Sequence, residues 1–583
     1  MISAFSFLPE PWPSWLKRSV AFVIDRVTAI HRLNQRYQTQ GFAGLSPEQF
    51  TRQFIAQFNL QISCQMPALP TNGPLIIVAN HPFGGLEGVV MAHLLAQQRS
   101  DVKILANRML GIFTELSDYF IYTNPLKAGA SGNLSSLKTA LAHLKTGGTL
   151  LVFPAGRVSY PQGTDNAVLD HRWHRSVAML AKQSQAPIIS CFISGQNRPG
   201  FYLAGKLWYR LRMILLVREL LVSNHKSFSV TFSQPIQELL PVADHHNTDL
   251  LQLVTYLQDP AYQQHWPTEE SQPEQALAPA QAKATLSAEL AALPEGQKLA
   301  QFKHYSSYYC SQAQCPSVVE EIRLLREANF RLLDEGSGKA QDGDQFDQSY
   351  THLLVFDHQA ERIIGAYRIG QTDNLLQQSG LAGLYLSRMF DFSSQFINQQ
   401  QPCLEMGRSF IVADQQRSFH GLLLLFRGIA AFVSQFPRYR VLYGTVSLSR
   451  QYTPLSVSLI QKFLTQPDAN VRAKLPFSHP VHPALAEYLA RQPRDIDSLD
   501  WLVRQIEPDG KGVPVLVRQY HQLGARFYCV GIDPNFAATP GLLLSVDISQ
   551  APEKLQKLFF ADLLPVYKQR VSDAALLQGA PST

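Results

Sequence analysis

Two short segments near the N-terminus carry residue types that suit proton transfer from a hydroxyl group. The first, NHPFGGLEG at 80–88, follows the apolar run LIIVA at 75–79, which predicts a buried strand. His81 can take a proton from an attacking hydroxyl, and Glu87 can orient the imidazole and stabilise its charged form. The pattern therefore predicts a general base at His81 with Glu87 as its partner.

The second segment, FPAGRVS at 153–159, follows another strand-like run at 149–152. Together the two segments resemble two motifs of the glycerolipid acyltransferase family, whose members acylate lysophosphatidic acid and related lysolipids. In that family the acid is an aspartate one position closer to the histidine, and a glutamate usually stands where this chain has Ala155. This departure argues against a glycerol phosphate acceptor but leaves acyl transfer in place. The resemblance implies that the acceptor head group contacts Gly156, Arg157 and Ser159.

The composition predicts a protein of two or three domains without a disulfide framework. The chain has 583 residues, too many for one hydrophobic core. Charged residues make up 16%, below the roughly 25% of ordinary soluble domains. The six cysteines show no paired spacing, so we expect neither a metal site nor disulfides, and a reducing cytosol is the natural compartment.

The charge is unevenly distributed along the chain. Residues 1–250 hold 22 of the 51 Lys and Arg but 13 of the 45 Asp and Glu, so this part is basic. A basic half suits an anionic membrane surface or an acidic carrier protein. Nucleic acid is the rival partner, but the sequence shows no aromatic–basic interleaving and no nucleic-acid motif, so we expect none.

The sequence predicts a peripheral protein without a transmembrane helix. It contains no apolar run of about 18 residues or more, and no cleavable signal peptide is expected. Two segments suit an interfacial helix, 5–30 with Trp12 and Trp15, and 202–222 with Trp208. An ordinary amphipathic helix packed on its own domain is the equal alternative for both.

Strands and helices are expected to alternate from 74 to 235 and again from about 317, which predicts α/β domains. The first region should contain strands at 75–79, 102–105, 149–153, 188–193 and 227–232, and helices at 134–145 and 174–184. The second region should contain strands at 352–356, 362–369, 403–412, 439–446, 513–519, 527–532 and 542–547, and helices at 318–333 and 422–434. Between them lies a segment rich in Gln, Ala, Pro and Glu, which predicts a linker that is helical near 282–292. We therefore expect domains at 1–257 and 298–555, a linker at 258–297 and a tail at 556–583.

A second set of segments resembles another family. LEMGRSF at 404–410, the acidic loop at 342–347 and ERIIGAYR at 361–368 resemble the ornithine–acyl carrier protein N-acyltransferases, which share a GNAT-like fold with the acyl-homoserine lactone synthases. The tail at 512–520 resembles extended members described as hemolysin-like. The resemblance implies transfer of an acyl group from a thioester to an amine. The shared features are carried by Arg331, Asp344, Phe346, Asp347, Arg368, Glu405, Gly407, Arg408 and Ser409.

These residue types fit an amino acid as the acceptor. Glu405 could take a proton from the amine directly or through water. Asp344 and Asp347 could hold an ammonium group, and Arg408 could clamp a carboxylate in a bidentate fork, with Ser409 beside it. The structural alternatives are a solvated turn for the acidic loop and a buried ion pair for Glu405 and Arg408.

The domain order resembles that of bifunctional ornithine lipid synthases. This predicts a mixed α/β protein with a glycerolipid-acyltransferase-like N-terminal domain and a GNAT-like C-terminal domain. The C-terminal domain would N-acylate ornithine with a 3-hydroxyacyl thioester, and the N-terminal domain would O-acylate the new hydroxyl at the cytoplasmic face of a bacterial inner membrane. The donor would be acyl carrier protein or acyl-CoA, with no bound cofactor. The segment 417–421 lacks the spacing of the GNAT cofactor loop, which leaves room for a carrier-bound phosphopantetheine arm.

Three alternatives remain open from the sequence. The acceptor could be another amine, such as glycine, lysine or a polyamine. The chain could be a lysophospholipid acyltransferase with a non-catalytic C-terminal domain. It could also be a membrane-binding or lytic protein, although two separate acyltransferase resemblances do not follow from that reading.

Overall fold

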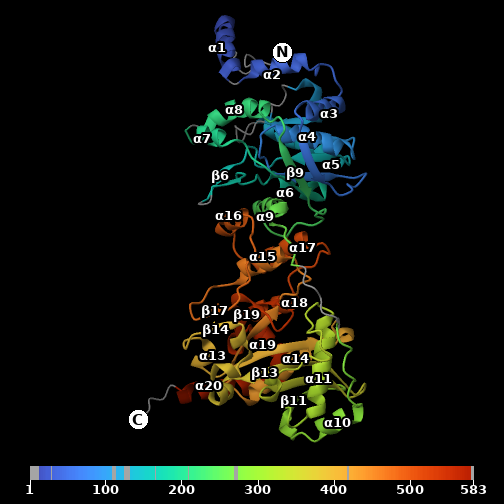
Figure 1. Cartoon of the computed structure of the whole chain (residues 1–583), viewed down its shortest axis with the longest axis vertical. Coiled ribbons are helices and arrows are strands. Elements are labelled where there is room, and N and C mark those ends of the chain that lie inside the picture. The colour runs from blue at the N-terminus through green and yellow to red at the C-terminus, as the bar shows by residue number, and fades with distance from the viewer. Residues whose placement is uncertain are drawn as a thin grey trace. The chain divides into compact units, whose positions relative to one another are not determined.

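The computed structural model describes residues 12–27, 29–107, 113–123, 131–163, 166–207, 209–267, 274–416 and 419–578. The chain forms two compact units, each built around its own sheet (Figure 1). The first unit comprises Met1–Gln264 and Pro480–Lys511, and the second comprises His265–His479 and Gly512–Thr583. Both units mix helices and strands, as the sequence predicts.

The first unit contains a seven-stranded sheet in the order β1-β9-β8-β2-β5-β3-β4. Its strands are β1 (Gln61–Gln65), β2 (Leu75–Ala79), β3 (Val102–Asn107), β4 (Phe120–Thr123), β5 (Thr149–Val152), β8 (Ile188–Ile193) and β9 (Ser227–Phe232). All neighbours are parallel except β8 and β9. A separate hairpin is formed by β6 (Tyr160–Gln162) and β7 (Ala167–Leu169).

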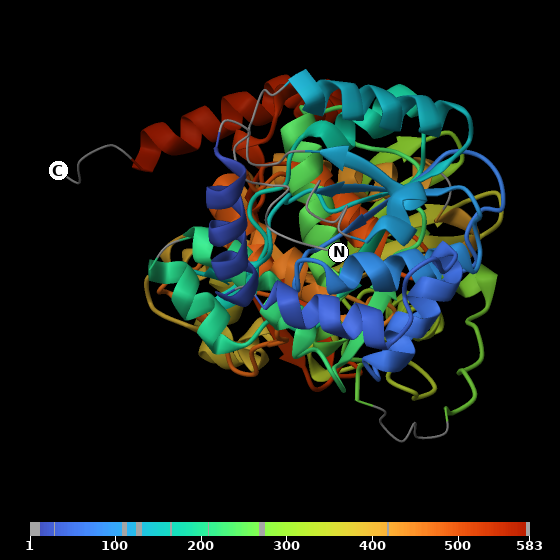
Figure 2. The same cartoon turned by 90° about the horizontal axis from the view of Figure 1, so that it is seen from above.

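Strand β2 lies at the centre of this sheet and is buried on both faces, which explains its unbroken apolar run. Leu75, Ile77 and Ala79 join a hydrophobic cluster with residues of α3 and α4. Figure 2 shows α5, in cyan, on one side of the strands, and the bluer α3 and α4 on the other. The helices are α1 (Ser14–Val27), α2 (Ile30–Thr39), α3 (Pro47–Gln57), α4 (Leu86–Ala96), α5 (Ser131–Lys145), α6 (Ser176–Ser184), α7 (Pro199–Leu207), α8 (Tyr209–Leu221) and α9 (Asp244–Leu257).

Residues 480–511 belong to the first unit, although the sequence analysis placed them in the C-terminal domain. They form α16 (Ala484–Arg491) and α17 (Ile496–Ile506), which both pack on α9. Trp501 Nε1 donates to the Glu238 carbonyl at 3.0 Å, and His482 stacks on Tyr256 with 4.7 Å between ring centroids. Each helix is amphipathic, so burial of its apolar side against α9 stabilises the packing of this segment on the first unit.

The second unit contains an eight-stranded sheet in the order β10-β11-β12-β13-β15-β16-β19-β18. Neighbouring strands are antiparallel except β15 and β16, which run parallel. The strands are β10 (Lys298–Phe302), β11 (Tyr305–Cys310), β12 (Thr351–Asp357), β13 (Arg362–Gln371), β15 (Cys403–Ile411), β16 (Val441–Ser447), β18 (Arg526–Asp533) and β19 (Thr539–Asp547). A two-stranded ribbon is formed by β14 (Phe390–Phe392) and β17 (Val471–Ala473).

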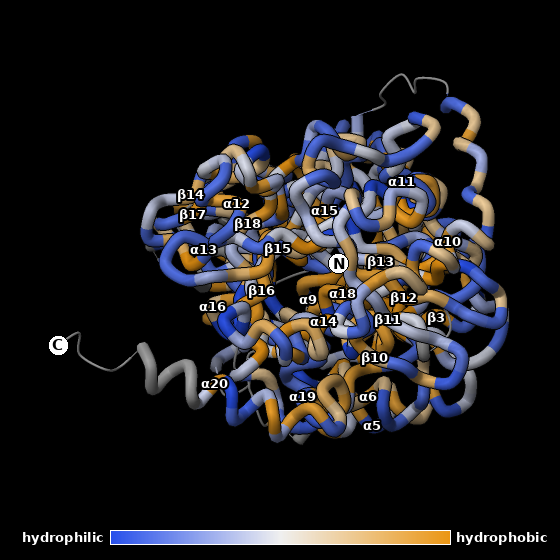
Figure 3. Tube along the Cα trace, turned by 90° about the horizontal axis from the view of Figure 1, so that it is seen from below, coloured by the Kyte–Doolittle hydropathy of each residue, from blue (hydrophilic) through white to orange (hydrophobic). Residues whose placement is uncertain are grey.

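Several helices surround this sheet. They are α10 (Lys283–Ala291), α11 (Pro316–Arg331), α12 (Thr372–Ser379), α13 (Ile397–Gln400), α14 (Phe419–Gln435), α15 (Pro454–Leu464), α18 (Val515–Gln522), α19 (Glu553–Phe560) and α20 (Leu564–Gln578). Figure 3 shows apolar segments, in orange, gathered on the strands and on α14, with hydrophilic loops around them. Part of the expected linker also belongs to this unit, because α10 packs on α11 and buries Leu286 and Leu290.

The strand predicted at 513–519 is wrong. The segment forms the helix α18, which begins directly after Pro514. Its buried residues, Val517 and Tyr520, are three positions apart, which is the spacing of one helix face. The valines at 513, 515 and 517 mimic the alternation of a strand, but tertiary packing selects the helical period.

Within the described residues, no helix is long and apolar enough to cross a bilayer.

The packing of α17 on α9 can be tested by truncating a buried residue. Leu502 is 0% exposed, so Leu502→Ala should cost about 2–5 kcal/mol of stability. Hydrogen exchange should then rise in α9, in the first unit. The control Arg504→Ala alters an exposed residue of the same helix and should stay within about 0.5 kcal/mol. Faster exchange confined to the second unit would contradict this arrangement.

Candidate active sites

The two motifs of the first unit lie side by side at one edge of the sheet. His81 follows β2 and the 153–159 segment follows β5, and these two strands are adjacent and parallel. The Ser159 amide donates to the His81 carbonyl at 2.9 Å, and the rings of Phe153 and His81 are 4.8 Å apart. In open α/β sheets this carboxyl edge of the strands is where ligands bind.

The Glu87 carboxylate is turned back onto the loop that precedes it. Its Oε1 lies 2.8 Å from Nδ1 of His81, and the side chain is 0% exposed. Three successive backbone amides, those of residues 83, 84 and 85, also donate to the carboxylate at 2.8–3.0 Å. Burial alone would raise the pKa of Glu87, but the His81 ring and the amides of Gly84 and Gly85 outweigh it and lower the pKa to about 2. Glu87 is therefore a fixed anion beside the imidazole.

The same contact sets the protonation of His81. Burial lowers the pKa of the imidazole, but the negative charges of Glu87 and Asp170 more than offset this, so the pKa lies above its ordinary value. A carboxylate at Nδ1 favours the tautomer with its proton on that nitrogen. Nε2 is then the ring nitrogen that can accept a proton from a hydroxyl.

Asp170 is a member of this site that the sequence analysis missed. It is 3% exposed, and its carboxylate accepts the His81 amide at 3.1 Å, the Ser159 hydroxyl at 2.5 Å and Trp173 Nε1 at 2.8 Å. Burial raises its pKa, and these donors partly oppose that effect. Asp170 follows β7 and lies outside both motifs, so only the folded chain brings it into contact with His81.

The three predicted head-group contacts have different positions. Gly156 and Arg157 are exposed, next to the His81 loop. Ser159 instead is 1% exposed, and its hydroxyl is committed to Asp170. The expected direct contact of Ser159 with the acceptor is therefore corrected to a positioning role.

The His81–Glu87 arrangement predicts a particular pH dependence. Only the neutral imidazole accepts a proton, so O-acylation should rise with pH through a midpoint above about 6.5, the ordinary histidine pKa. Glu87→Gln removes the charge that raises this pKa, so the midpoint should fall and the plateau rate should drop roughly 10²–10⁴-fold. The pH profile of kcat/KM with a lyso-lipid measures both. The exposed-site control Glu238→Gln should leave the profile unchanged, and an unmoved midpoint in Glu87→Gln would contradict the assignment.

The second unit has a cavity where two parallel strands separate. Strands β15 and β16 pair from Cys403–Val441 to Met406–Gly444, after which β15 continues beside β13 and β16 continues beside β19. At the last paired position a Cβ on Gly444 would lie 2.4 Å from the Met406 carbonyl oxygen, so only glycine fits. The cavity has a volume of about 160 Å³, and its walls include Glu405, Gly407, Arg408 and Ser409.

Glu405 lies in this wall and is 2% exposed. Its carboxylate accepts the hydroxyl of Tyr350 at 2.8 Å, the hydroxyl of Tyr443 at 2.7 Å and the amide of Leu386 at 3.2 Å. Burial raises its pKa, and the tyrosine hydroxyls partly oppose the rise. A carboxylate with a raised pKa in a cavity is suited to receive a proton from a nearby amine.

Arg408 lies in a bulge of β15. Its φ of +50° is in the left-handed region, which a non-glycine residue adopts only when its surroundings require it. The register against β13 shifts here, as in a β-bulge. Nη2 donates to the Tyr385 hydroxyl at 3.0 Å, and the guanidinium lies 4.4 Å from the Phe536 ring centroid. The bulge thus presents a cation to the cavity wall.

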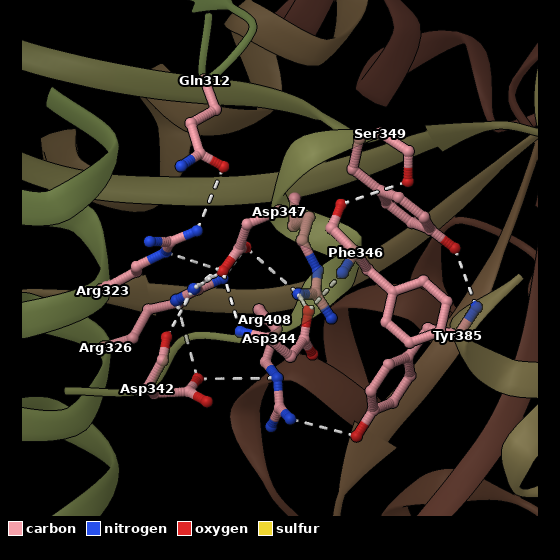
Figure 4. A network of polar contacts seen from close by, with 12 residues as sticks. Gln312, Arg323, Arg326, Asp342, Asp344, Phe346, Asp347, Ser349, Tyr385 and Arg408 are labelled. Carbon is pink, nitrogen blue, oxygen red and sulfur yellow. Dashed lines mark hydrogen bonds and ion pairs between the residues drawn. The ribbon is translucent and has the colours of Figure 1, made fainter. Parts of the chain in front are cut away.

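The acidic loop is a structural network and not a solvated turn (Figure 4). Asp347 is 0% exposed and is bound by Arg323 at 2.9 Å, Arg326 at 2.9 Å and Arg368 at 3.1 Å. Burial raises the pKa of Asp347, but the charges of Arg326 and Arg368 outweigh it and hold the pKa well below its ordinary value. The expected ammonium-binding role of Asp347 is therefore corrected, because its oxygens already face arginines.

Asp344 belongs to the same network. Its Oδ1 lies 2.5 Å from Arg368 and accepts the Phe346 amide at 2.9 Å. Arg331, which the resemblance included, is bound to Glu327 at 2.8 Å instead. Arg326, which the sequence did not single out, is the buried arginine that binds Asp347.

Removing the charge of Asp347 tests this structural role. Asp347→Asn would remove the buried carboxylate that Arg323, Arg326 and Arg368 share, so we expect a loss of about 3–5 kcal/mol and faster hydrogen exchange in β12 and β13. The control Asp391→Asn breaks a surface pair with Arg472 and should cost at most about 1 kcal/mol. Unchanged stability with a raised KM for the amine would restore the ammonium-binding role.

Two families match the segments of the chain that contain these two candidate sites. The family described as "Acyltransferase" matches residues 7–256, and the "Acetyltransferase (GNAT) domain" matches residues 325–426. This protein is an acyltransferase. It has an N-terminal acyltransferase domain and a C-terminal GNAT-like domain.

Several known proteins are similar to parts of this acyltransferase. A glycine N(alpha)-acyltransferase of Bacteroides thetaiotaomicron is 29% identical over 262 residues, which are 41% of this chain and 77% of that protein. A lyso-glycine lipid O-acyltransferase of Phocaeicola vulgatus is 26% identical over 175 residues, 29% of this chain and 61% of that protein. The solved 1-acyl-sn-glycerophosphate acyltransferase of Thermotoga maritima is 12% identical, covers 39% of this chain and 89% of its own, and has a TM-score of 0.23.

Proposed function

We propose that this acyltransferase makes an amino acid lipid in two steps, with ornithine as the amino acid. The C-terminal domain transfers a 3-hydroxyacyl group from a thioester to the amine, and the N-terminal domain acylates the resulting hydroxyl. The observation that carries the proposal is the presence, in one chain, of a His81–Glu87 pair suited to a hydroxyl and a Glu405 cavity suited to an amine. The names of the two relatives support the order of the steps, because one acylates an amino acid and the other acylates a lyso-lipid.

In the first step the acceptor amine attacks the thioester carbonyl while Glu405 takes the proton that the nitrogen loses. The new C–N bond replaces the C–S bond, and the leaving thiolate takes that proton from Glu405, which restores the carboxylate. The two tyrosine hydroxyls that hold Glu405 keep the carboxylate in the cavity wall during this exchange. We propose a phosphopantetheine thioester as donor, on acyl carrier protein or coenzyme A. Arg417 and Ser418 of the expected cofactor segment lie outside the described residues.

In the second step His81 takes the proton from the lyso-lipid hydroxyl as its oxygen attacks a second thioester. A C–O bond forms, the C–S bond breaks and the imidazolium returns the proton to the leaving thiol. Glu87 stabilises the charged ring between these events. Arg157, exposed beside this loop, would contact the acceptor head group.

We also propose that the protein works on a membrane surface, with α1 as one contact. Trp15, Phe22 and Val23 are 69%, 60% and 58% exposed and lie on one helix face, since they are seven and eight positions apart. Lys17, Arg18 and Arg26 on the same helix would suit anionic lipid headgroups. Residues 5–11 and 28 of the first expected interfacial segment, and Trp208 of the second, lie outside the described residues.

Glycine is the second candidate acceptor, and the names of the curated relatives favour it. It lacks a side-chain ammonium, so the two acceptors place different demands on the same cavity. Feeding labelled ornithine or labelled glycine to cells and following the label into lipid separates the two.

The two-step proposal predicts a distinct lipid for each variant. In a host without aminolipids, the chain should produce diacylated ornithine lipid, detected by mass spectrometry. His81→Ala should stop at the lyso form, and Glu405→Ala should yield neither product. The control His31→Ala, at an exposed histidine of the first unit, should match the unaltered chain. Diacyl product from His81→Ala would refute the assignment of the first site.

A further inference from the structure

Glu335 is a buried carboxylate in the wall of the C-terminal cavity, and neither motif includes it. It follows the end of α11, is 1% exposed and lines the same cavity as Glu405. Its Oε2 accepts the Ser447 hydroxyl at 3.0 Å. Its Oε1 is buried and, within the part of the chain that the structure describes, has no hydrogen-bond partner. The carboxylate is thus only half satisfied.

Burying a carboxylate oxygen without a hydrogen bond costs free energy, and a bound ligand that donates a hydrogen bond to this oxygen would remove that cost. The nearby cation Arg408 is directed elsewhere, since its nitrogens contact Asp342 at 3.5 Å and Tyr385 at 3.0 Å (Figure 4). Burial raises the pKa of Glu335 to about 7, although Ser447 and the charge of Arg408 oppose the rise. A cationic ligand beside Oε1 would lower this pKa again and hold Glu335 as an anion.

Two residues of strand β16 bind the two carboxylates of the cavity. Tyr443, which binds Glu405, and Ser447, which binds Glu335, lie four residues apart on β16. Their side chains share a face of the sheet, and Glu405 and Glu335 both line the one cavity. An acceptor with a single amino group has no charge to offer the second carboxylate. A diamino acid has a second ammonium, which can pair with Glu335 while the first amine reacts.

We propose that Glu335 binds the side-chain ammonium of a diamino acid acceptor and thereby makes the C-terminal site prefer ornithine over glycine. This inference rests on the N-acylation proposed above and names the residue that selects its acceptor. Glu405 serves the reacting amine whichever amino acid is bound, so the two carboxylates have separable roles. Glu335 is a specificity-determining residue that contacts the substrate away from the reacting nitrogen.

The test uses the full-length chain and three amines. Ornithine carries the side-chain ammonium, norvaline has the same carbon skeleton without it, and glycine has no side chain. Thiol release from an acyl thioester measures kcat and KM for each. Glu335→Gln keeps the shape of the side chain but removes its charge, so kcat/KM for ornithine should fall roughly 10–100-fold, with the loss in KM. Norvaline and glycine should change by no more than about twofold.

The matched control is Asp334→Asn, which removes the neighbouring exposed carboxylate and should leave all three amines unchanged. An equal loss for all three amines in Glu335→Gln would overturn the inference, because the residue would then act on the reacting nitrogen or on the fold. An unchanged ornithine KM would overturn it too, while leaving the proposed function intact. Failure of ornithine as a substrate of the unaltered chain, with glycine accepted, would remove both the ornithine assignment and this inference before any variant is made.

Discussion

A carboxylate that leaves water must be surrounded by N–H groups or cations, because its uncompensated burial costs several kcal/mol. Both sites of this protein are organised around that constraint. In the first unit, Glu87 is enclosed by three backbone amides and His81. In the second unit, Asp347 is enclosed by three arginines. These contacts stabilise the loops that bear the two carboxylates.

The same constraint explains the position of the acid in the first motif. Glu87 stands one residue further from the histidine than the related motif places its aspartate. The longer side chain folds back across the loop, where Gly84, with φ of +93°, provides both an amide and the absence of a Cβ. A Cβ there would lie 2.5 Å from Val158 of the second motif. The offset is therefore compatible with a close His–carboxylate contact, which spacing alone does not reveal.

The buried acids fall into two groups, those that line the C-terminal cavity and those that do not. Asp170 and Asp347 have their oxygens occupied by donors of the protein itself, so they position other groups. Glu405 also has both oxygens bound, by two tyrosine hydroxyls and the Leu386 amide, but it lines the cavity. Glu335 lines the same cavity and, among the described residues, has no hydrogen-bond partner for one of its oxygens. We therefore expect the stability of the second unit to depend on the arginine network, and we propose that its chemistry depends on Glu405 of β15 and on Glu335, which follows α11.

The sequence by itself determined the alternating α/β elements, the two motifs at the ends of β2 and β5, and the strand that bears Glu405. These features follow from hydrophobic periodicity and from residues close together in the chain, so they are readable locally. Tertiary structure alone decided that residues 480–511 complete the first unit, that 513–519 forms a helix, and that Asp170 lies under His81. It also decided that Asp347 is bound by Arg326 and that Glu335 faces the cavity. Each of these depends on contacts between residues distant in sequence or on which face of an element is buried, and neither is encoded in local spacing.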